Sequence, residues 1–128
     1  MTEPFFDRLA AAVREKKSTL CVGLDPHLGG LPSHLLPPAD GSPSPDALAD
    51  AIVAFNGSVI DAVADFAACV KPQVAFYERL GIAGWRAYRD TLALCRKKNL
   101  LVIADAKRGD IGSTAAAYSS IHLGWDDG

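Results

Sequence analysis

The chain has 128 residues, of which 49% are hydrophobic and 22% are charged, and its formal net charge is −2. This length fits one small domain or a piece of one, and the balanced charge argues against a nucleic-acid partner. No apolar run approaches the ~20 residues that cross a bilayer, and residues 1–17 lack the pattern of a secretory leader. We therefore expect a cytoplasmic protein with no membrane partner.

The cysteines are odd in number, far apart and surrounded by apolar residues: Cys21, Cys69 and Cys95. This pattern indicates neither a disulfide framework nor a zinc site, so we expect reduced packing residues. The histidines are also scattered along the chain: His27, His34 and His122. We therefore expect no metal site.

Helical spacing of apolar residues predicts an amphipathic helix over residues 4–16, with Phe5, Phe6, Leu9 and Val13 on one face. Residues 19–24 form a short apolar run, which predicts a buried strand that ends at residues 25–26. A long loop rich in proline, glycine and serine follows over residues 28–45. At its end, residues 44–46 have the chemistry of a helix start, with a capping hydroxyl and a proline in the first turn.

Two further helices are predicted from apolar stripes that recur every three or four residues. The stripe of the first, which begins near Leu48, consists of Ile52, Phe55, Val59, Val63 and Phe66. The stripe of the second, over residues 81–98, consists of Ile82, Trp85, Leu92 and Cys95. We expect Phe66 and Trp85 in the core, a surface or packing role for Asn56, and a helix stop at Asn99.

Two more strands are predicted, over residues 68–72 and residues 100–105. The continuous apolar character of the second indicates burial on both faces, as in a parallel sheet covered by helices. Strands alternating with helices predict a parallel α/β fold, either an open doubly wound sheet or a (β/α)8 barrel. No Gly-x-Gly-x-x-Gly and no Gly-Lys-Ser/Thr phosphate loop follows the first strand.

Charged residues stand at the C-terminal end of each predicted strand: Asp25, Lys71 and the cluster over residues 105–110. Catalytic residues spread over several strand ends are typical of a barrel. We therefore expect an α/β fold that is the N-terminal part of a (β/α)8 TIM barrel, with about three β/α units.

Asp105 and Lys107 are two residues apart, so on an extended backbone they project to the same side, and Asp110 lies in the loop beyond. A lysine between two carboxylates stays an ammonium ion, which can supply a proton and stabilise developing negative charge. A solvated, salt-bridged turn is the alternative. The position after a long apolar strand favours a catalytic role.

Residues 103–114 resemble the signature of orotidine 5'-phosphate decarboxylases, with the sequence IADAKRGDIGST. Residues 23–26 (GLDP) and residues 70–78 (VKPQVAFYE) are similar to two further segments of that family, in the family's order. The long loop after the first strand and the motif Lys-Pro-Gln at residues 71–73 resemble the larger bacterial subfamily of these decarboxylases. The resemblance implies decarboxylation of orotidine 5'-monophosphate to uridine 5'-monophosphate in pyrimidine biosynthesis, without metal or organic cofactor.

The resemblance also implies a role for each matching residue. Lys107 is the expected proton donor to C6 of the pyrimidine, and Asp105 lies against the departing carboxylate. Lys71 is expected to link Asp105 to a ribose hydroxyl, and Asp25 to hold the ribose. Asp110 is expected to complete the site of the partner in a homodimer.

Two further residues, Ile111 and Thr114, are expected to shape that shared edge and to contact the substrate. Thr114 has a second interpretation, because residues 112–114 can cap the helix that follows the signature.

The chain is shorter than the ~250 residues of a closed barrel, so residues 1–128 are expected to be the incomplete N-terminal portion of one barrel domain. The family's phosphate-gripping loop and pyrimidine-covering loop are not found, and residues 119–128 diverge from the family pattern. We expect this chain alone to be inactive. Alternatives are a magnesium-dependent sugar-phosphate decarboxylase or synthase of the same superfamily, and a non-catalytic half-barrel; residues 70–78 favour the pyrimidine enzyme.

Overall fold

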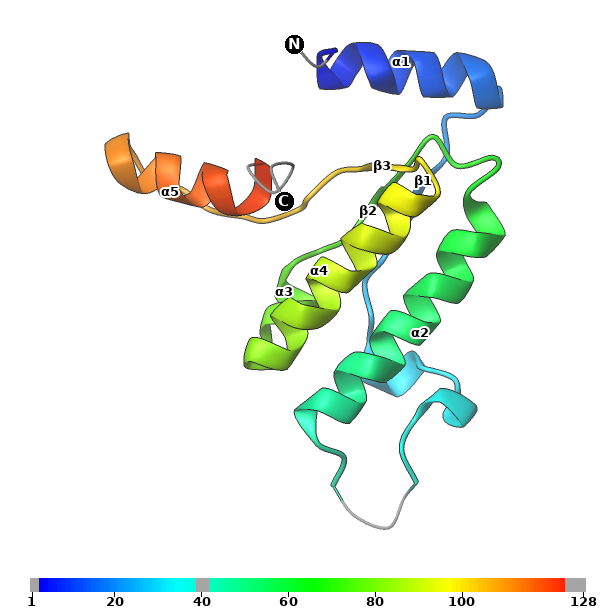
Figure 1. Cartoon of the computed structure of the whole chain (residues 1–128), viewed down its shortest axis with the longest axis vertical. Helices are drawn as coiled ribbons and strands as arrows, with labels where there is room; N and C mark the ends of the chain where they lie inside the picture. The colour runs from blue at the N-terminus through cyan, green and yellow to red at the C-terminus, as the bar shows by residue number, and fades with distance from the viewer. Residues whose placement is uncertain (1–2, 39–41, 124–128) are drawn as a thin grey trace.

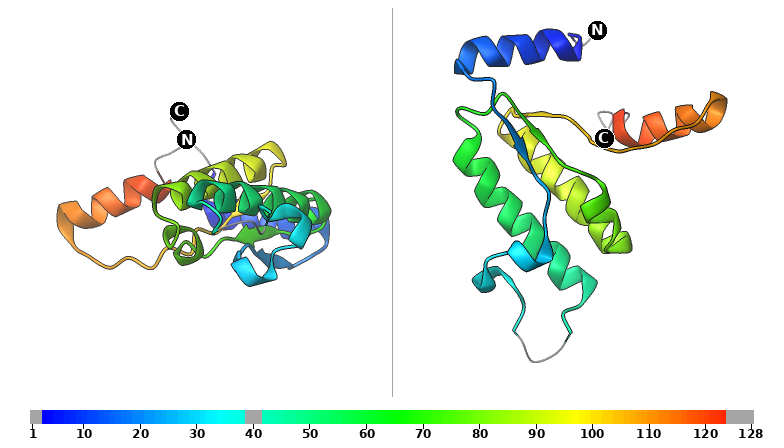
Figure 2. Two further views of the ribbon diagram at one scale, coloured as in Figure 1. Left: turned by 90° about the horizontal axis from the view of Figure 1, so that it is seen from below. Right: turned by 180° about the vertical axis from the view of Figure 1, so that it is seen from behind.

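The computed structural model describes residues 3–38 and 42–123. A helix α1 (Phe5–Lys16) precedes β1 (Cys21–Gly23), and two short 3-10 turns, η1 (Leu28–Gly30) and η2 (Ser33–Leu35), follow. Next come α2 (Pro45–Val63), β2 (Cys69–Lys71), α3 (Ala75–Glu78), α4 (Gly81–Lys97), β3 (Leu101–Val102) and α5 (Gly112–Leu123). Figure 1 shows α2 and α4 side by side along the sheet, and Figure 2 shows that both cover the same face of it.

The strands form a parallel sheet in the order β1-β2-β3. The register aligns Cys21 with Cys69, and Cys69 with Leu101. Pairing continues beyond the short strands, because Leu24 N donates to the Lys71 carbonyl (3.1 Å) and Asp105 pairs with Gln73 as an isolated parallel bridge. The predicted strand positions are confirmed. The parallel strands with their covering helices are the α/β architecture that the alternation of strands and helices predicted.

The prediction that the third strand is buried on both faces was wrong for β3 in the described part of the chain. Leu101 and Val102 are half-buried, since β3 is the edge of the sheet and α2 and α4 cover only one face. The expectation for the cysteines fails at one position for a related reason. Cys69 and Cys95 are buried, whereas Cys21 is exposed on β1, the opposite edge strand.

Local sequence signals fix the helix ends as expected. The Ser44 hydroxyl accepts a hydrogen bond from Ala47 N (3.2 Å), and Pro45 occupies the first turn, so α2 begins there. Asn99 adopts a left-handed conformation (φ 52°), and Leu100 N donates to the Cys95 carbonyl (3.0 Å). This geometry ends α4 and turns the chain into β3.

The inward face of α4 differs in part from the predicted stripe, since Cys95 is fully buried as predicted and Trp85 and Leu92 pack partly buried against the core. Ile82 is 92% exposed, and the buried positions are small or polar: Ala83, Gly84, Ala87, Tyr88, Thr91 and Cys95. The short helix α3 packs so closely on α4 that a Cβ atom at Gly84 would overlap the Tyr77 carbonyl oxygen. Small residues therefore occupy this interface, and the bulky Ile82 faces away from it.

Two other predicted core positions are only partly buried. Phe66 is 48% exposed because α2 ends at Val63, before the stripe reaches Phe66. Trp85 is half-buried and packs on the core from the edge. By contrast, Ile52 and Ile60 of α2 are fully buried, so the stripe of α2 is correct in its middle.

Helix α1 lies across the end of the sheet (Figure 1), and none of its residues is buried. Lys16 ties its end to α2, because its ammonium donates to the carbonyls of Ala64 (2.7 Å) and Ala67 (2.9 Å). Phe6 is 80% exposed, whereas Phe5, Leu9 and Val13 are half-buried, so the apolar face predicted for this helix is only partly covered in the described residues. No helix in the described ranges combines the length and apolar character of a membrane span.

Candidate active site

The C-terminal ends of the parallel strands bring four polar side chains to one edge of the sheet. Asp25 follows β1, Lys71 ends β2, Gln73 lies two residues beyond it, and Asp105 follows β3. Parallel strands end on the same side, so residues that are far apart in sequence meet there. The bridge between Gln73 and Asp105 holds the backbones of these two segments together.

Asp105 is the centre of this group. Its Oδ1 atom accepts a hydrogen bond from Lys107 Nζ (2.6 Å), and its Oδ2 atom accepts from Gln73 Nε2 (2.8 Å) and Lys71 Nζ (3.3 Å). The Lys107 hydrogen bond is the main cause that lowers the pKa of Asp105, and the Lys71 hydrogen bond adds to it against the opposing effect of desolvation. Asp105 is therefore an ionised carboxylate between two ammonium groups.

Asp25 joins the same group through the backbone. Its Oδ1 atom accepts a hydrogen bond from Gln73 N (3.1 Å), so the carboxylate after β1 is tied to the segment after β2. The segment before Asp25 is fixed as well, because the Tyr77 hydroxyl donates to the Leu24 carbonyl (3.0 Å). The sheet and α3 together place Asp25.

The buried side chain of Asn56 supports this arrangement from α2. Asn56 Nδ2 donates to the Tyr77 hydroxyl (2.9 Å) and to Thr91 Oγ1 (3.0 Å), and all three side chains are fully buried. Burial raises the pKa of the Tyr77 phenol, so its hydroxyl remains protonated and can donate. The packing role expected for Asn56 is confirmed.

The loop after Asp105 is more exposed. The Lys107 side chain is 77% exposed and contacts Asp105, while Arg108 forms an ion pair with Glu78 and lies 5.7 Å from the centre of the Tyr118 ring. Asp110 Oδ1 accepts a hydrogen bond from Ile111 N (2.8 Å). Across residues 3–38 and 42–123 no ion pair joins Lys107 to Asp110, so Asp105 is the carboxylate that Lys107 contacts within this chain.

The two remaining candidates lie further along the chain. Ile111 is 86% exposed just before α5, and Thr114 is exposed in the first turn of that helix. Gly112 begins α5 with a positive φ of 58°. The structure therefore brings together Asp25, Lys71, Asp105 and Lys107, and it leaves Asp110, Ile111 and Thr114 on an open surface.

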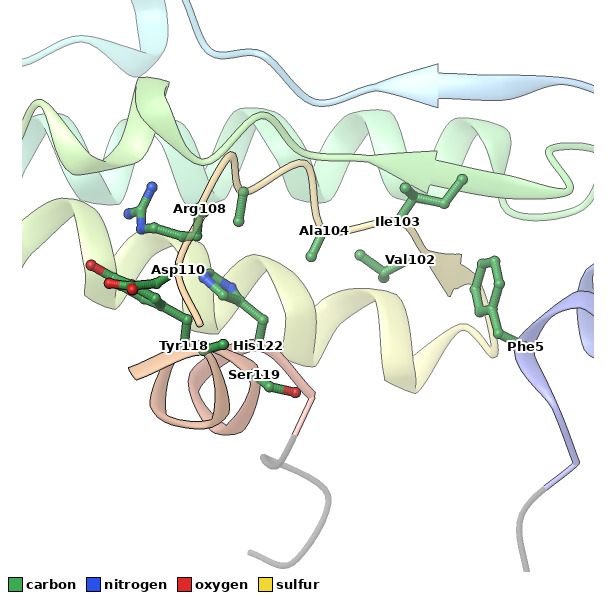
Figure 3. A pocket seen from close by; sticks show the side chains of 12 residues that line it. Phe5, Val102, Ile103, Ala104, Arg108, Asp110, Tyr118, Ser119 and His122 are labelled. Carbon is green, nitrogen blue, oxygen red and sulfur yellow. The ribbon is translucent and has the colours of Figure 1, made fainter. Parts of the chain in front are cut away.

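A pocket of about 470 Å³ lies between the segment that contains β3 and helix α5 (Figure 3). Its lining comes from Phe5 of α1, from residues 102–104, 106 and 108–110, and from Ala115, Tyr118, Ser119 and His122 of α5. Desolvation and the Arg108 guanidinium lower the pKa of His122 there. Asp25, Lys71, Asp105 and Lys107 do not line it, so the charged cluster, not this pocket, is the candidate site. Within the described ranges, no three His, Cys, Asp or Glu residues are grouped closely enough to hold a metal ion.

Sequence reasoning missed one member of the cluster, Gln73. The signal was present, because Lys71 and Gln73 are two residues apart on an extended segment and therefore project to the same side. The same argument identified Asp105 and Lys107. The prediction selected charged residues and therefore did not include a neutral amide. Gln73 nevertheless makes two contacts here, one through its side chain and one through its backbone.

The chain is similar to known proteins over most of its length. Residues 18–126 match the family model described as "Orotidine 5'-phosphate decarboxylase / HUMPS family". An orotidine 5'-phosphate decarboxylase of Herpetosiphon aurantiacus is 47% identical over 116 residues, which cover 91% of this chain and 39% of that protein. One of Clostridium perfringens is 43% identical over 112 residues, which cover 88% of this chain and 37% of the relative.

Solved structures of orotidine 5'-monophosphate decarboxylases are also similar to this chain. The OMP decarboxylase of Leishmania donovani superposes with a TM-score of 0.69 at 33% identity, over 92% of this chain and 39% of that chain. The orotidine 5'-monophosphate decarboxylase of Plasmodium berghei, at 20% identity and a TM-score of 0.79, shows the shared fold over 95% of this chain. The α/β architecture is that of part of a TIM barrel, and the chain spans less than two fifths of the length of these two curated relatives.

Proposed function

The chain belongs to the orotidine 5'-phosphate decarboxylase / HUMPS family, and we propose that it carries charged residues that decarboxylate orotidine 5'-monophosphate to uridine 5'-monophosphate. One observation carries the proposal: Asp105 is held between Lys107 Nζ and the Lys71 and Gln73 donors at the ends of parallel strands. The similarity to decarboxylases at 47% and 43% identity supports the choice of substrate.

The chemistry of the reaction fits this cluster. Carbon dioxide leaves C6 of the pyrimidine with its bonding electrons left on the ring, and no adjacent group delocalises that charge. The site must therefore supply a fixed cation and a proton at one carbon. Lys107 supplies both in this proposal, since its ammonium is already oriented by a carboxylate 2.6 Å away.

Asp105 has a second role in the proposal. Its low pKa keeps it ionised, so a substrate carboxylate that binds beside it meets negative charge until carbon dioxide leaves. Lys71 balances this charge from the other side and reaches toward a ribose hydroxyl. Asp25, which the Gln73 backbone holds in place, binds the ribose.

The exposed residues beyond the cluster are proposed to act in a homodimer. Asp110 bonds only to the backbone of its own loop among the described residues, which leaves the second oxygen of its carboxylate for a partner's site. Ile111 is 86% exposed next to it, and in this proposal the partner subunit covers its apolar side chain. Thr114 is proposed to contact the substrate at the same edge.

We propose further that residues 1–128 are a portion of a single barrel domain that works in the cytoplasm without a metal or organic cofactor. The described strands β1, β2 and β3 account for part of the eight strands of a closed barrel. The 128-residue chain alone is therefore expected to show negligible turnover. No observation on the described residues favours the magnesium-dependent sugar-phosphate alternative.

The test is a reconstitution with the remaining part of the barrel from the Herpetosiphon relative. We expect the mixture to consume orotidine 5'-monophosphate, which is measured by the loss of its absorbance. Lys107→Ala is expected to lower this rate at least about 100-fold. Lys97→Ala is the matched control, because Lys97 is an exposed lysine in the last turn of α4. Turnover that survives Lys107→Ala contradicts the proposal.

A second arm of the test compares ligands. The mixture is expected to bind 6-hydroxyuridine 5'-monophosphate, an analogue of the carbanion, with no requirement for magnesium. Binding of a sugar phosphate in preference to this nucleotide, with activity that depends on magnesium, points to the alternative enzyme and contradicts the proposal.

A further inference from the structure

We propose that Gln73 is a positioning residue of this site, which orients the Asp105 carboxylate through its side chain and the Asp25 carboxylate through its backbone N–H. The contacts stand on their own, and their consequence for catalysis rests on the function proposed above. Gln73 Nε2 lies 2.8 Å from Asp105 Oδ2, and Gln73 N lies 3.1 Å from Asp25 Oδ1. One residue thus links the carboxylates that follow β1 and β3.

The backbone of Gln73 is fixed before its side chain acts. Asp105 N donates to the Pro72 carbonyl (3.1 Å), and Val74 N donates to the Asp105 carbonyl (3.1 Å), on the two sides of Gln73. Pro72 and Val74 are also buried. The amide therefore projects from a rigid point, and little conformational entropy is lost when it holds the carboxylate.

The donors on Asp105 are divided between its oxygens. Gln73 and Lys71 both approach Oδ2, and the amide is the nearer of the two, at 2.8 Å against 3.3 Å. Among the described residues, Lys107 alone donates to Oδ1. Because the amide keeps Oδ2 on its own side, Oδ1 points toward the loop and the Lys107 ammonium has a single place to bind.

A neutral donor suits this position better than a charged group. A third ammonium would add positive charge to a carboxylate that already has two, whereas an amide orients it and leaves its charge unchanged. A glutamate would place like charges in contact and would raise the pKa of one of them. Gln73 can thus determine where Lys107 Nζ lies although it need not touch the reacting carbon.

The first measurement uses the 128-residue chain and does not depend on activity. Gln73 is the only glutamine in the sequence, so its side-chain amide gives an assignable NMR signal, which we expect to titrate together with the Asp105 carboxylate. In Gln73→Leu the pKa of Asp105 is expected to rise by about 0.5 or more, because a donor to the ionised form is lost. Gln73→Glu is expected to raise it further.

An internal control comes from Asp61, which pairs with Lys98 (2.7 Å) on the helical side of the protein. The carboxyl signal of Asp61 is expected to stay unchanged in both variants, which shows that the fold is intact. If Asp105 titrates identically in the parent chain and in Gln73→Leu while the Asp61 signal is unchanged, Gln73 does not position Asp105 and the proposal is overturned.

The second measurement uses the reconstituted barrel and separates positioning from substrate binding. Gln73→Leu keeps the backbone N–H that holds Asp25, so KM is expected to change less than twofold, while kcat falls at least about 10-fold because Lys107 is displaced. An equal loss through KM overturns the proposal. If the NMR shift appears but no preparation turns over, the positioning role stands and the proposed function fails.

Discussion

Gly84→Ala is expected to destabilise the chain strongly, because the backbone of α3 occupies the space that a methyl group needs. A Cβ atom at Gly84 would overlap the Tyr77 carbonyl oxygen, lie 2.7 Å from the carbonyl carbon and lie 3.1 Å from Leu80 Cβ. Ordinary carbon contacts need about 3.5–4.0 Å. Overpacking of this kind typically costs about 1–3 kcal/mol of stability. We expect a cost of about 3 kcal/mol here, because the obstacle is backbone and cannot rotate away.

The helix itself favours the same substitution. Alanine is better than glycine by about 1 kcal/mol inside a helix, so the net loss for Gly84→Ala is about 2 kcal/mol. Gly57→Ala in α2 is the matched control, since its Cβ would meet Leu94 Cδ1 at 3.5 Å, an ordinary contact. This variant keeps the gain in helix propensity, and we expect it to be about 0.5–1 kcal/mol more stable than the parent chain.

Urea unfolding followed by far-ultraviolet circular dichroism measures the difference. The two variants are expected to differ by about 2.5 kcal/mol, which separates their midpoints by about 1.7 M at a slope of about 1.5 kcal/mol per M. If Gly84→Ala and Gly57→Ala unfold at the same urea concentration, the close packing of α3 on α4 does not limit stability and the reasoning is refuted.

Three further predictions concern the site and its support. Lys107→Ala is expected to raise the pKa of Asp105 toward its ordinary value, as measured by carboxyl NMR. The folded pKa of Asp105 lies below the ordinary one, so the Lys107–Asp105 pair stabilises the fold above the ordinary pKa. This stabilisation is lost as the pH falls through the folded pKa. Tyr77→Phe leaves a buried carbonyl at the end of β1 without its donor, and urea unfolding is expected to show a loss of about 1–3 kcal/mol. Cys21 is expected to react first with a thiol reagent such as 5,5'-dithiobis(2-nitrobenzoate), because its side chain is exposed. Burial raises the pKa of the Cys69 and Cys95 thiols to about 11, so they are expected to react more slowly. Equal reaction rates for the three cysteines would contradict this prediction.

The charged part of the site could be predicted from the sequence because two simple rules suffice there. Residues two apart on an extended segment share a side, and the ends of parallel strands share an edge. These rules brought Asp25, Lys71, Asp105 and Lys107 to one place, as the structure has them. They do not reach Asp110, because the conformation of the loop after the strand is not periodic.

The face of α4 could not be predicted in the same way. A hydrophobic stripe selects the largest apolar residues, such as Ile82, whereas a close helix contact selects the smallest, such as Gly84 and Ala87. The sequence does not show how near α3 will come, since that helix contains only residues 75–78. The position of α4 and the burial of Cys95 were therefore predicted correctly, and the error concerns the residues that face α3.

The contacts of Asp105 make the site asymmetric. If Lys107 is removed, Asp105 keeps Lys71 and Gln73 on Oδ2, so its position changes little. If Asp105 is removed, Lys107 loses its ion pair and its hydrogen bond together, and a side chain that is 77% exposed has nothing else in the described residues to orient it. The proton donor is therefore positioned by the carboxylate, and the carboxylate is positioned by donors at the end of β2 and just beyond it. In the proposed reaction, the precision with which a proton reaches C6 thus depends on the β2 segment as much as on the signature that contains Lys107 itself.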